Sequence, residues 1–153
     1  MSIIFNDMKG RKDFFFEGSV PMEKIKLAEK KIGLRFANDY IEYVMQYGTI
    51  SCNGHELTGI SCDAYLDVVY VTENQWNKNI YVEHLLYVIE ETHIDGIVIW
   101  QSSTGEIYQT APNMKPVKIC DSLVEYINLW HGIVKKCAVG EYPKSEIDRY
   151  QAA

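Results

Sequence analysis

Apolar residues recur at spacings of three and four after Pro21, and this pattern predicts two short amphipathic helices. Pro21 suits the first turn of the first helix, Gly33 can end it in a left-handed conformation, and Gly48 can end the second. Asn38 or Asp39 can cap the start of the second helix. Helices this short cannot bury their apolar faces alone, so downstream segments must cover them. The apolar residues are Met22, Ile25, Ala28 and Ile32 in the first helix, and Tyr40, Ile41, Val44 and Tyr47 in the second.

Beyond these helices, alternating and β-branched apolar runs predict a mostly antiparallel sheet. The dipeptide Asn53-Gly54 is a strong signal for a two-residue hairpin, with strands near 49–52 and 55–60. A second hairpin is expected around the polar loop 102–105. The remaining strands are expected at 85–90, 97–100, 106–110 and 117–119.

Residues 63–79 are compatible with two structures. The valine-rich run 68–71 favours a strand, whereas the apolar spacing over 65–72 also fits a helix that continues towards Trp76. The polar stretch 74–79 is expected to form a loop.

Two further segments complete the expected fold. A long helix is expected from Ser122, because Ser122 and Glu125 are spaced as a capping box and apolar residues continue at three and four as far as Cys137. Near the N-terminus, a short helix is expected at 3–10. The aromatic run 14–16 is expected to form either a brief strand or a turn that packs against the two helices.

These elements predict an α+β fold, in which helices pack on a mostly antiparallel β-sheet. The 153 residues suit a single domain with one core, expected over 1–140 and followed by a polar C-terminal tail over 141–153. Apolar residues at 47% and charged residues at 24% are ordinary values for a globular chain.

The helical segment also resembles the opening of a known family. It reads Ile25-x-x-Ala28-Glu29-x-x-Ile32-Gly33-x-x-Phe36-Ala37-x-Asp39-Tyr40-x-x-Tyr43-Val44-x-x-Tyr47-Gly48. This run is similar to the start of proteins of the SUKH superfamily (Smi/Knr-like proteins), although Ala37 stands where the family usually has Pro. A thinner similarity continues through Glu56-Leu57-x-Gly59-Ile60, residues 97–108 and Asp121–Tyr126, so the resemblance spans about residues 20–130.

The resemblance implies a SUKH-type α+β domain that binds another protein. Bacterial proteins similar to this one are mostly immunity proteins, which bind and neutralise the toxic C-terminal domain of a polymorphic toxin, often a nuclease or a deaminase. The fungal members suggest an alternative, a regulatory scaffold of the Smi/Knr type that links signalling proteins in cell-wall control. A third hypothesis is an enzyme that acts through Cys120 or through carboxylates.

Charge and targeting signals restrict the partners further. The formal net charge of −6 argues against direct nucleic-acid binding and suits a basic protein partner. No apolar run approaches the roughly 18 residues that span a bilayer, and the N-terminus lacks the apolar core of a signal peptide. We therefore expect a cytoplasmic protein, a monomer or weak dimer, without membrane association. In that compartment the four cysteines Cys52, Cys62, Cys120 and Cys137 are expected to be reduced thiols.

One group of residues invites a zinc site. Cys52 and His55 are spaced as a close ligand pair, and Cys62 with either His84 or His93 could complete the set. Structural zinc sites usually supply close pairs on both sides, and the second pair is missing here. We expect no metal and no cofactor.

Cys120 is the best candidate for a nucleophile, because it precedes a predicted helix N-terminus, a position that favours a thiolate. A partner base is lacking, since His131 would lie about 13 Å along the helix by its rise. We therefore expect no catalytic residue, and a packing role for Cys120.

Acidic residues in the middle of the chain give the best candidate for a partner-binding face. Aromatic side chains ringed by charges are typical of binding hot spots, and charges set the specificity and the rate of association. The expected contact residues are Asp63, Asp67, Tyr70, Glu73, Trp76, Glu90, Glu91 and Asp95.

Overall fold

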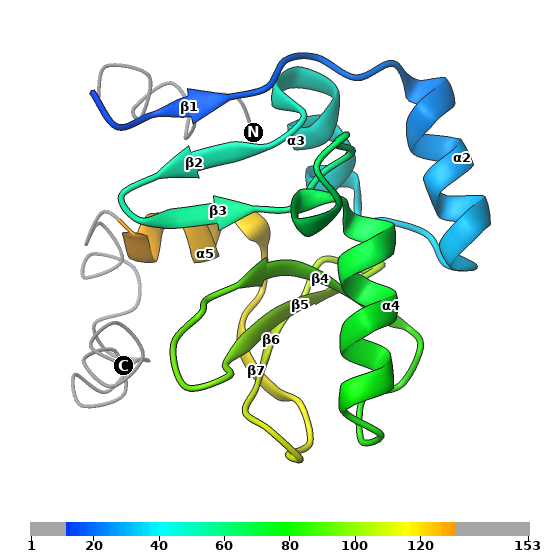
Figure 1. Ribbon diagram of the computed structural model, residues 1–153, viewed down its shortest axis with the longest axis vertical. Coiled ribbons are helices and arrows are strands. Elements are labelled where there is room, and N and C mark those ends of the chain that lie inside the picture. Colours follow the sequence, from blue (N-terminus) through cyan, green and yellow to red (C-terminus); the bar gives the residue numbers. More distant parts are fainter. Residues whose placement is uncertain (1–11, 131–153) are drawn as a thin grey trace.

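The computed structural model describes residues 12–130 as two antiparallel sheets and four α-helices, which confirms the α+β class (Figure 1). The sheets have the strand orders β1-β2-β3 and β4-β5-β6-β7. The strands are β1 (Phe15–Phe16), β2 (Ile50–Cys52), β3 (His55–Leu57), β4 (Leu86–Glu91), β5 (Val98–Ser102), β6 (Ile107–Thr110) and β7 (Val117–Cys120). The helices are α2 (Met22–Ile32), α3 (Asn38–Tyr47), α4 (Val68–Lys78) and α5 (Leu123–Trp130), with a 3-10 turn η1 (Ala64–Leu66) before α4.

Both predicted hairpins form. Asn53 and Gly54 connect β2 to β3 with φ angles of 53° and 78°, as a two-residue turn with positive φ at both positions requires. The second hairpin joins β5 to β6 around residues 102–105. The aromatic run near the N-terminus is a strand, since Phe15 and Phe16 pair with β2.

The ambiguous middle segment contains a helix, and the prediction of a loop at 74–79 is wrong. The helix α4 continues through the polar residues to Lys78. Only one side of α4 is buried, through Val68, Val71 and Thr72. A helix that covers a sheet with one face tolerates polar residues on the rest of its surface, so the polar run does not end it.

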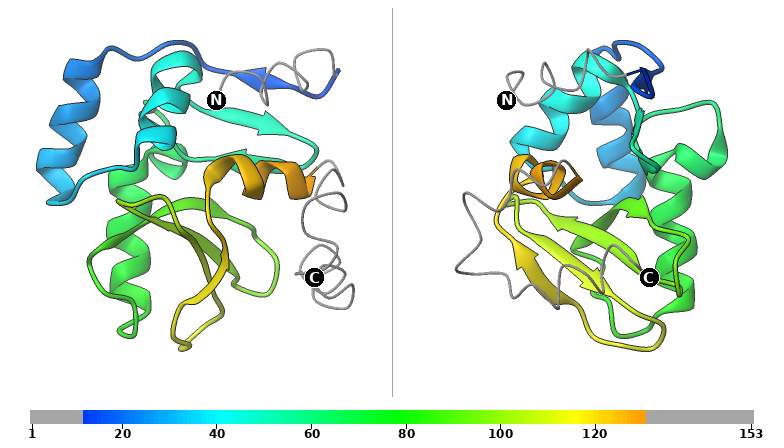
Figure 2. Two further views of the ribbon diagram at one scale, coloured as in Figure 1. Left: turned by 180° about the vertical axis from the view of Figure 1, so that it is seen from behind. Right: turned by 90° about the vertical axis from the view of Figure 1, so that its left-hand side faces the viewer.

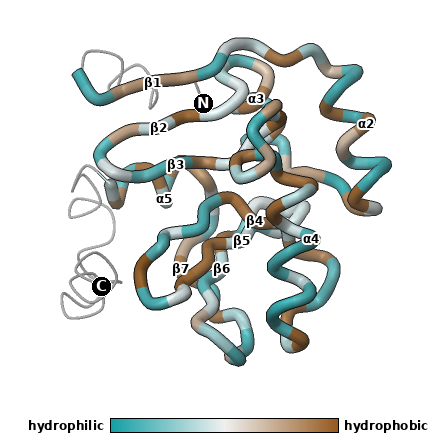
Figure 3. Tube along the Cα trace, in the orientation of Figure 1, coloured by the Kyte–Doolittle hydropathy of each residue, from teal (hydrophilic) through white to brown (hydrophobic). Residues whose placement is uncertain are grey.

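The four-stranded sheet has a separate apolar layer on each face. The helix α4 covers one face, where Val71 packs with Val88 and Trp100. On the other face, a larger core joins the sheet to α2, α3, α5 and the three-stranded sheet. Figure 2 shows α5 lying between the two sheets. Figure 3 shows the matching pattern, with apolar residues along β4 and β5 and alternating polar and apolar residues along α4.

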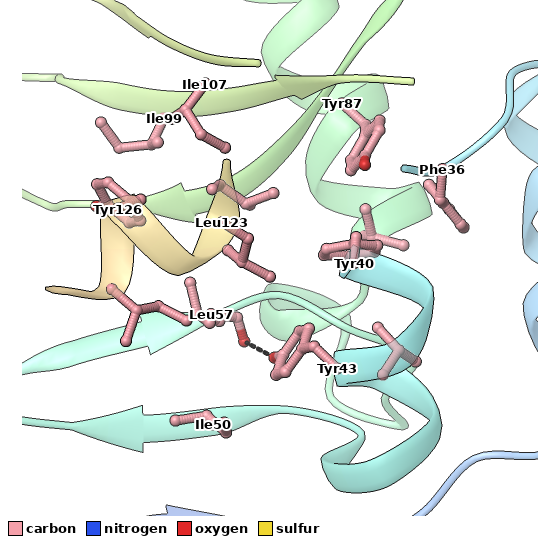
Figure 4. Packing of buried hydrophobic residues seen from close by; sticks show 14 of the residues in the cluster. Phe36, Tyr40, Tyr43, Ile50, Leu57, Tyr87, Ile99, Ile107, Leu123 and Tyr126 are labelled. Carbon is pink, nitrogen blue, oxygen red and sulfur yellow. Dashed lines mark hydrogen bonds between the residues drawn. The ribbon is translucent and has the colours of Figure 1, made fainter. Parts of the chain in front are cut away.

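Buried tyrosines bring polar groups into the larger core (Figure 4). The Tyr40 hydroxyl forms a hydrogen bond with Thr58 Oγ1 at 2.9 Å, and the Tyr43 hydroxyl donates to the Thr58 carbonyl at 2.7 Å. The Tyr87 hydroxyl donates to Gln101 Oε1 at 2.8 Å. Burial raises the pKa of Tyr40, Tyr43 and Tyr87 well above that of a free tyrosine.

The start of α3 lacks the side-chain cap that the sequence predicts. The helix begins at Asn38, as predicted, but Ala37 is the N-cap residue and makes no side-chain hydrogen bond, so the prediction that Asn38 or Asp39 caps the helix is wrong. The N–H of Ala37 instead donates to the Tyr87 hydroxyl at 2.9 Å. Proline has no N–H, so the proline that the family usually has at this position could not form this hydrogen bond. The Asp39 carboxylate serves a different element and accepts from the N–H of Leu123.

Three glycines allow three chain segments to cross in contact. A Cβ atom added to Gly59 would lie 1.6 Å from the carbonyl oxygen of Gly48. One added to Gly48, whose φ is 76°, would lie 2.4 Å from the carbonyl oxygen of Gly18. The segment that follows β3 can therefore pass directly against the turn that ends α3 only because these positions lack side chains.

Some expectations lie outside the described residues. These are the helix at 3–10, the extension of the last helix beyond Trp130 to Cys137, and the polar tail at 141–153. The boundary of the single domain near residue 140 therefore stays a prediction.

Candidate protein-binding face

The eight expected contact residues lie on neighbouring elements. Asp63 and Asp67 flank η1, and Asp95 lies in the turn between β4 and β5. The helix α4 packs on η1 and β4, and it lines one groove together with the β4–β5 turn. The side chains of the eight residues nevertheless face different surroundings. The remaining five expected contact residues are Tyr70, Glu73 and Trp76 on α4, and Glu90 and Glu91 on β4.

The two aspartates organise the chain that leads into α4. Asp63 Oδ1 accepts from the N–H of Tyr65 at 3.0 Å. Asp67 is the N-cap of α4 and accepts from the N–H groups of Tyr70 at 3.4 Å and Ser61 at 3.2 Å. The Asp67 carboxylate places negative charge at the N-terminus of α4, where the helix dipole stabilises it, whereas Asp63 caps η1.

The exposed surface of this region is aromatic as well as acidic. Tyr65 is 75% exposed and Tyr70 42%, and their rings meet edge to face with centroids 6.2 Å apart. Glu73 is exposed on the same helix as Tyr70. Exposed tyrosines beside carboxylates give a surface that can bind a basic protein.

Trp76 is fixed in the scaffold. Its indole Nε1 donates to the carbonyl of Leu86 at 3.0 Å, and its ring stacks on His84 with centroids 4.1 Å apart. The side chain is half-buried against both apolar layers. Trp76 therefore joins α4 to the start of β4, and only part of its surface is open to a partner.

A strand irregularity separates Glu90 from the surface. Regular alternation would place Glu90 on the same face as Val88, towards α4. The pairing register shifts between these two residues, and Glu90 lies in the larger core with 2% of its surface exposed. There it forms a hydrogen bond with His55 Nδ1 at 2.8 Å and accepts one from the Tyr126 hydroxyl. The structure thus places Glu90 outside the expected contact face.

Glu91 lies on the other side of β4 and lines a groove of about 440 Å³. The groove separates α4 from the turns that follow β4 and β6. Gln75 Nε2 donates to Glu91 Oε2 across it. Asp95 stands beside the groove in the β4–β5 turn, where it is exposed and has a φ of 54°. The polar and aromatic residues that line the groove include Tyr65, Asn74, Gln75, Lys78, Glu91 and His93.

Sequence reasoning missed Gln75 as a groove residue because it assigned residues 74–79 to a loop. The helical spacing was the available signal. Once α4 is read as a helix, Val71, Asn74, Gln75 and Lys78 fall on one side at intervals of three and four.

Charge is unevenly distributed along the chain and over the fold. Lys78 is the only lysine or arginine between Thr49 and Met114. The helix α2 carries a cluster of bases instead, Lys24, Lys26, Lys30 and Lys31. The acids between residues 49 and 114 are Glu56, Asp63, Asp67, Glu73, Glu83, Glu90, Glu91, Asp95 and Glu106.

The candidate zinc ligands have other contacts. Within residues 12–130, no three His, Cys, Asp or Glu side chains are grouped to hold a metal ion. His55 bonds Glu90 and stacks on Trp130, with ring centroids 4.5 Å apart. Cys52 is buried, whereas Cys62 is exposed on another segment.

Cys120 lies in the core rather than in an open site. Its side chain is 4% exposed, and its Sγ donates to the carbonyl of Ser122 at 3.7 Å. A nucleophilic thiol needs access for a substrate, and this position offers little. The base considered for it, His131, lies outside the described residues.

Fold and surface together define a small α+β protein with an acidic, tyrosine-bearing face. In the described part of the chain, no helix has the length and apolar character needed to cross a membrane. The family model described as SMI1-KNR4 cell-wall (SUKH_6) matches residues 22–127. The match covers most of the chain, and the protein therefore belongs to the SMI1-KNR4 family of the SUKH superfamily. A search of curated proteins finds no match.

Proposed function

We propose that this protein is an immunity protein, which binds and neutralises the toxic C-terminal domain of a cognate polymorphic toxin. Family membership supports a Smi/Knr-type binding protein. The observation that carries the proposal further is the acidic region from Thr49 to Met114, in which Lys78 is the single base. Such a surface is complementary to a toxin that is basic because it binds nucleic acid, as a nuclease or a deaminase does.

Neutralisation by this face requires no bond chemistry. The protein occupies the toxin's active site or a surface beside it, and forms a one-to-one complex. Exposed carboxylates, such as Glu73 and Asp95, occupy the place of nucleic-acid phosphates, while Tyr65 and Tyr70 supply aromatic contact area. The burial of Cys120 supports an inhibitor over an enzyme.

The test is a co-expression experiment. A candidate toxic domain, chosen from the genes that neighbour this one, is expressed alone and together with this protein. Growth is scored, and the complex is sought by size-exclusion chromatography. Rescue with a co-eluting one-to-one complex is the expected result. Rescue without co-elution would contradict stoichiometric inhibition and would favour enzymatic modification of the toxin.

Ionic strength provides a second test of the same mechanism. Charge complementarity speeds association at low salt, and the effect is screened as salt rises. We expect the association rate constant to fall steeply with ionic strength. A rate constant that does not change with salt would contradict nucleic-acid mimicry.

The cell-wall description of the matched family favours one alternative, a regulatory scaffold that links signalling proteins. The co-expression experiment separates the two functions. A scaffold would leave the toxin active and would bind its own partner without affecting growth.

A further inference from the structure

Glu91 is a partly buried carboxylate with spare capacity to accept hydrogen bonds. Asp39, Asp67 and Glu90 each accept two hydrogen bonds from groups of the protein. Within residues 12–130, Glu91 accepts one, from the neutral amide of Gln75. A carboxylate has room for about four such bonds, so the Glu91 carboxylate can accept further donors.

Glu91 also forms no ion pair in the part of the chain that the structure describes. Lys78 lines the same groove, but the ion pairs formed within residues 12–130 include neither Lys78 nor Glu91. A half-buried carboxylate is solvated less well than an exposed one. It therefore favours a cation that enters the groove with it.

The shape and lining of the groove suit one particular cation. Gln75 Nε2 donates to one oxygen of the Glu91 carboxylate, which restrains the orientation of the group. Tyr65 offers an exposed aromatic ring at the same groove. A guanidinium group binds a carboxylate through two parallel N–H groups and stacks on aromatic faces, whereas an ammonium group does neither as well.

We propose that the groove between α4 and the β4–β5 turn receives an arginine side chain from a loop of the basic partner, with Glu91 as its acceptor. The inference rests on the proposed function, since it specifies which surface meets the toxin and by what chemistry. The volume of about 440 Å³ accommodates an arginine together with the adjoining peptide backbone.

A peptide titration tests the groove without the toxin. The probe is a short peptide, blocked at both ends, with one arginine between glycine and serine residues. In the control peptide, neutral citrulline replaces the arginine. Chemical shifts of the ¹⁵N-labelled full chain are followed by NMR, including the side-chain amides of Asn74 and Gln75.

We expect saturable shifts of these amides with the arginine peptide, and binding about tenfold weaker with citrulline. Glu91→Gln should weaken arginine binding by about the same factor. Glu83→Gln, which removes an equal charge at an exposed position outside the groove, should leave binding unchanged. Equal binding of the two peptides, equal binding by the Glu91→Gln protein, or no shift in the groove would overturn the inference.

The same two variants separate this inference from the proposed function. If the wild-type complex forms, its dissociation should be about tenfold faster with Glu91→Gln and unchanged with Glu83→Gln. Equal dissociation of the two variants overturns the groove inference and leaves neutralisation intact. Failure of the wild-type protein to neutralise overturns the proposed function, and the peptide titration then decides by itself whether the groove binds arginine.

Discussion

The carboxylate of Asp39, in the first turn of α3, accepts a hydrogen bond from the backbone N–H of Leu123 at 2.9 Å. Leu123 is the first residue of α5, so Asp39 satisfies a donor at the start of a helix that lies 84 residues further along the chain. The other oxygen of Asp39 accepts from Gln101 Nε2 at 2.9 Å. One side chain of α3 thereby holds β5 and α5 in place.

Replacement of Asp39 by alanine should destabilise the protein by about 1–3 kcal/mol, because two partly buried donors lose their acceptor. The free energy of unfolding is measured by urea denaturation. Glu42→Ala is the matched control, since Glu42 is an exposed carboxylate on the same helix, and it should change stability by less than about 0.5 kcal/mol. Equal effects of the two changes would contradict the role given to Asp39.

The buried carboxylate of Glu90 gives a second prediction. Glu90→Gln should destabilise the fold by about 1–3 kcal/mol, because an amide cannot accept through both of its ends from His55 and Tyr126. Tyr126→Phe should be non-additive with it, and a double-mutant cycle should give a coupling energy of about 0.5 kcal/mol or more. Glu91→Gln, one residue away but on the groove side, should have little effect on stability. Additive effects of Glu90→Gln and Tyr126→Phe would contradict the contact.

The glycine crossing predicts a contrast between two substitutions. Gly59→Ala should cost about 3 kcal/mol or more, because the new Cβ would overlap the carbonyl oxygen of Gly48 at 1.6 Å and the backbone would have to move. Gly54→Ala has open space around it but a φ of 78°, so it should cost about 1–2 kcal/mol from backbone conformation alone. Midpoints of thermal unfolding measure both. A smaller loss for Gly59→Ala than for Gly54→Ala would show that the segments do not cross at this distance.

These long-range contacts explain why the sequence predicts only part of the fold. Helical spacing predicts α2 and α3, and the Asn53-Gly54 dipeptide predicts the first hairpin, because both signals are local. The sequence suggested Asp39 as a cap for its own helix, since nothing local connects it with Leu123.

The candidate face shows the same limit. An alternating strand pattern cannot reveal the register shift that turns Glu90 into the core, because the shift arises from pairing with β5. The sequence did identify Glu91 and Asp95 as contact candidates, and the structure places both at or beside the groove. It could not distinguish them from Glu90 without the positions of α4 and α5.

The buried tyrosines make stability depend on pH in the alkaline range. Burial raises the pKa of Tyr40, Tyr43 and Tyr87 in the folded protein, whereas in the unfolded chain each ionises near pH 10. Their contribution is therefore fully present below about pH 10 and is lost as pH rises towards the folded-state values, since only the unfolded chain releases the protons. Each tyrosine should lower the free energy of unfolding by about 1.4 kcal/mol per pH unit in that window.

The measurement is the free energy of unfolding by urea at a series of pH values from about 9 to about 11. Tyr87→Phe is the informative variant, because it removes one ionisable group while keeping the ring in the core. It loses the hydrogen bonds to Ala37 and Gln101, so its stability should be lower at every pH. The free energy of unfolding of this variant should, however, fall less steeply with pH than that of the wild type, by the contribution of one tyrosine. An unchanged slope would mean that Tyr87 ionises equally in the folded and unfolded states, which its burial opposes.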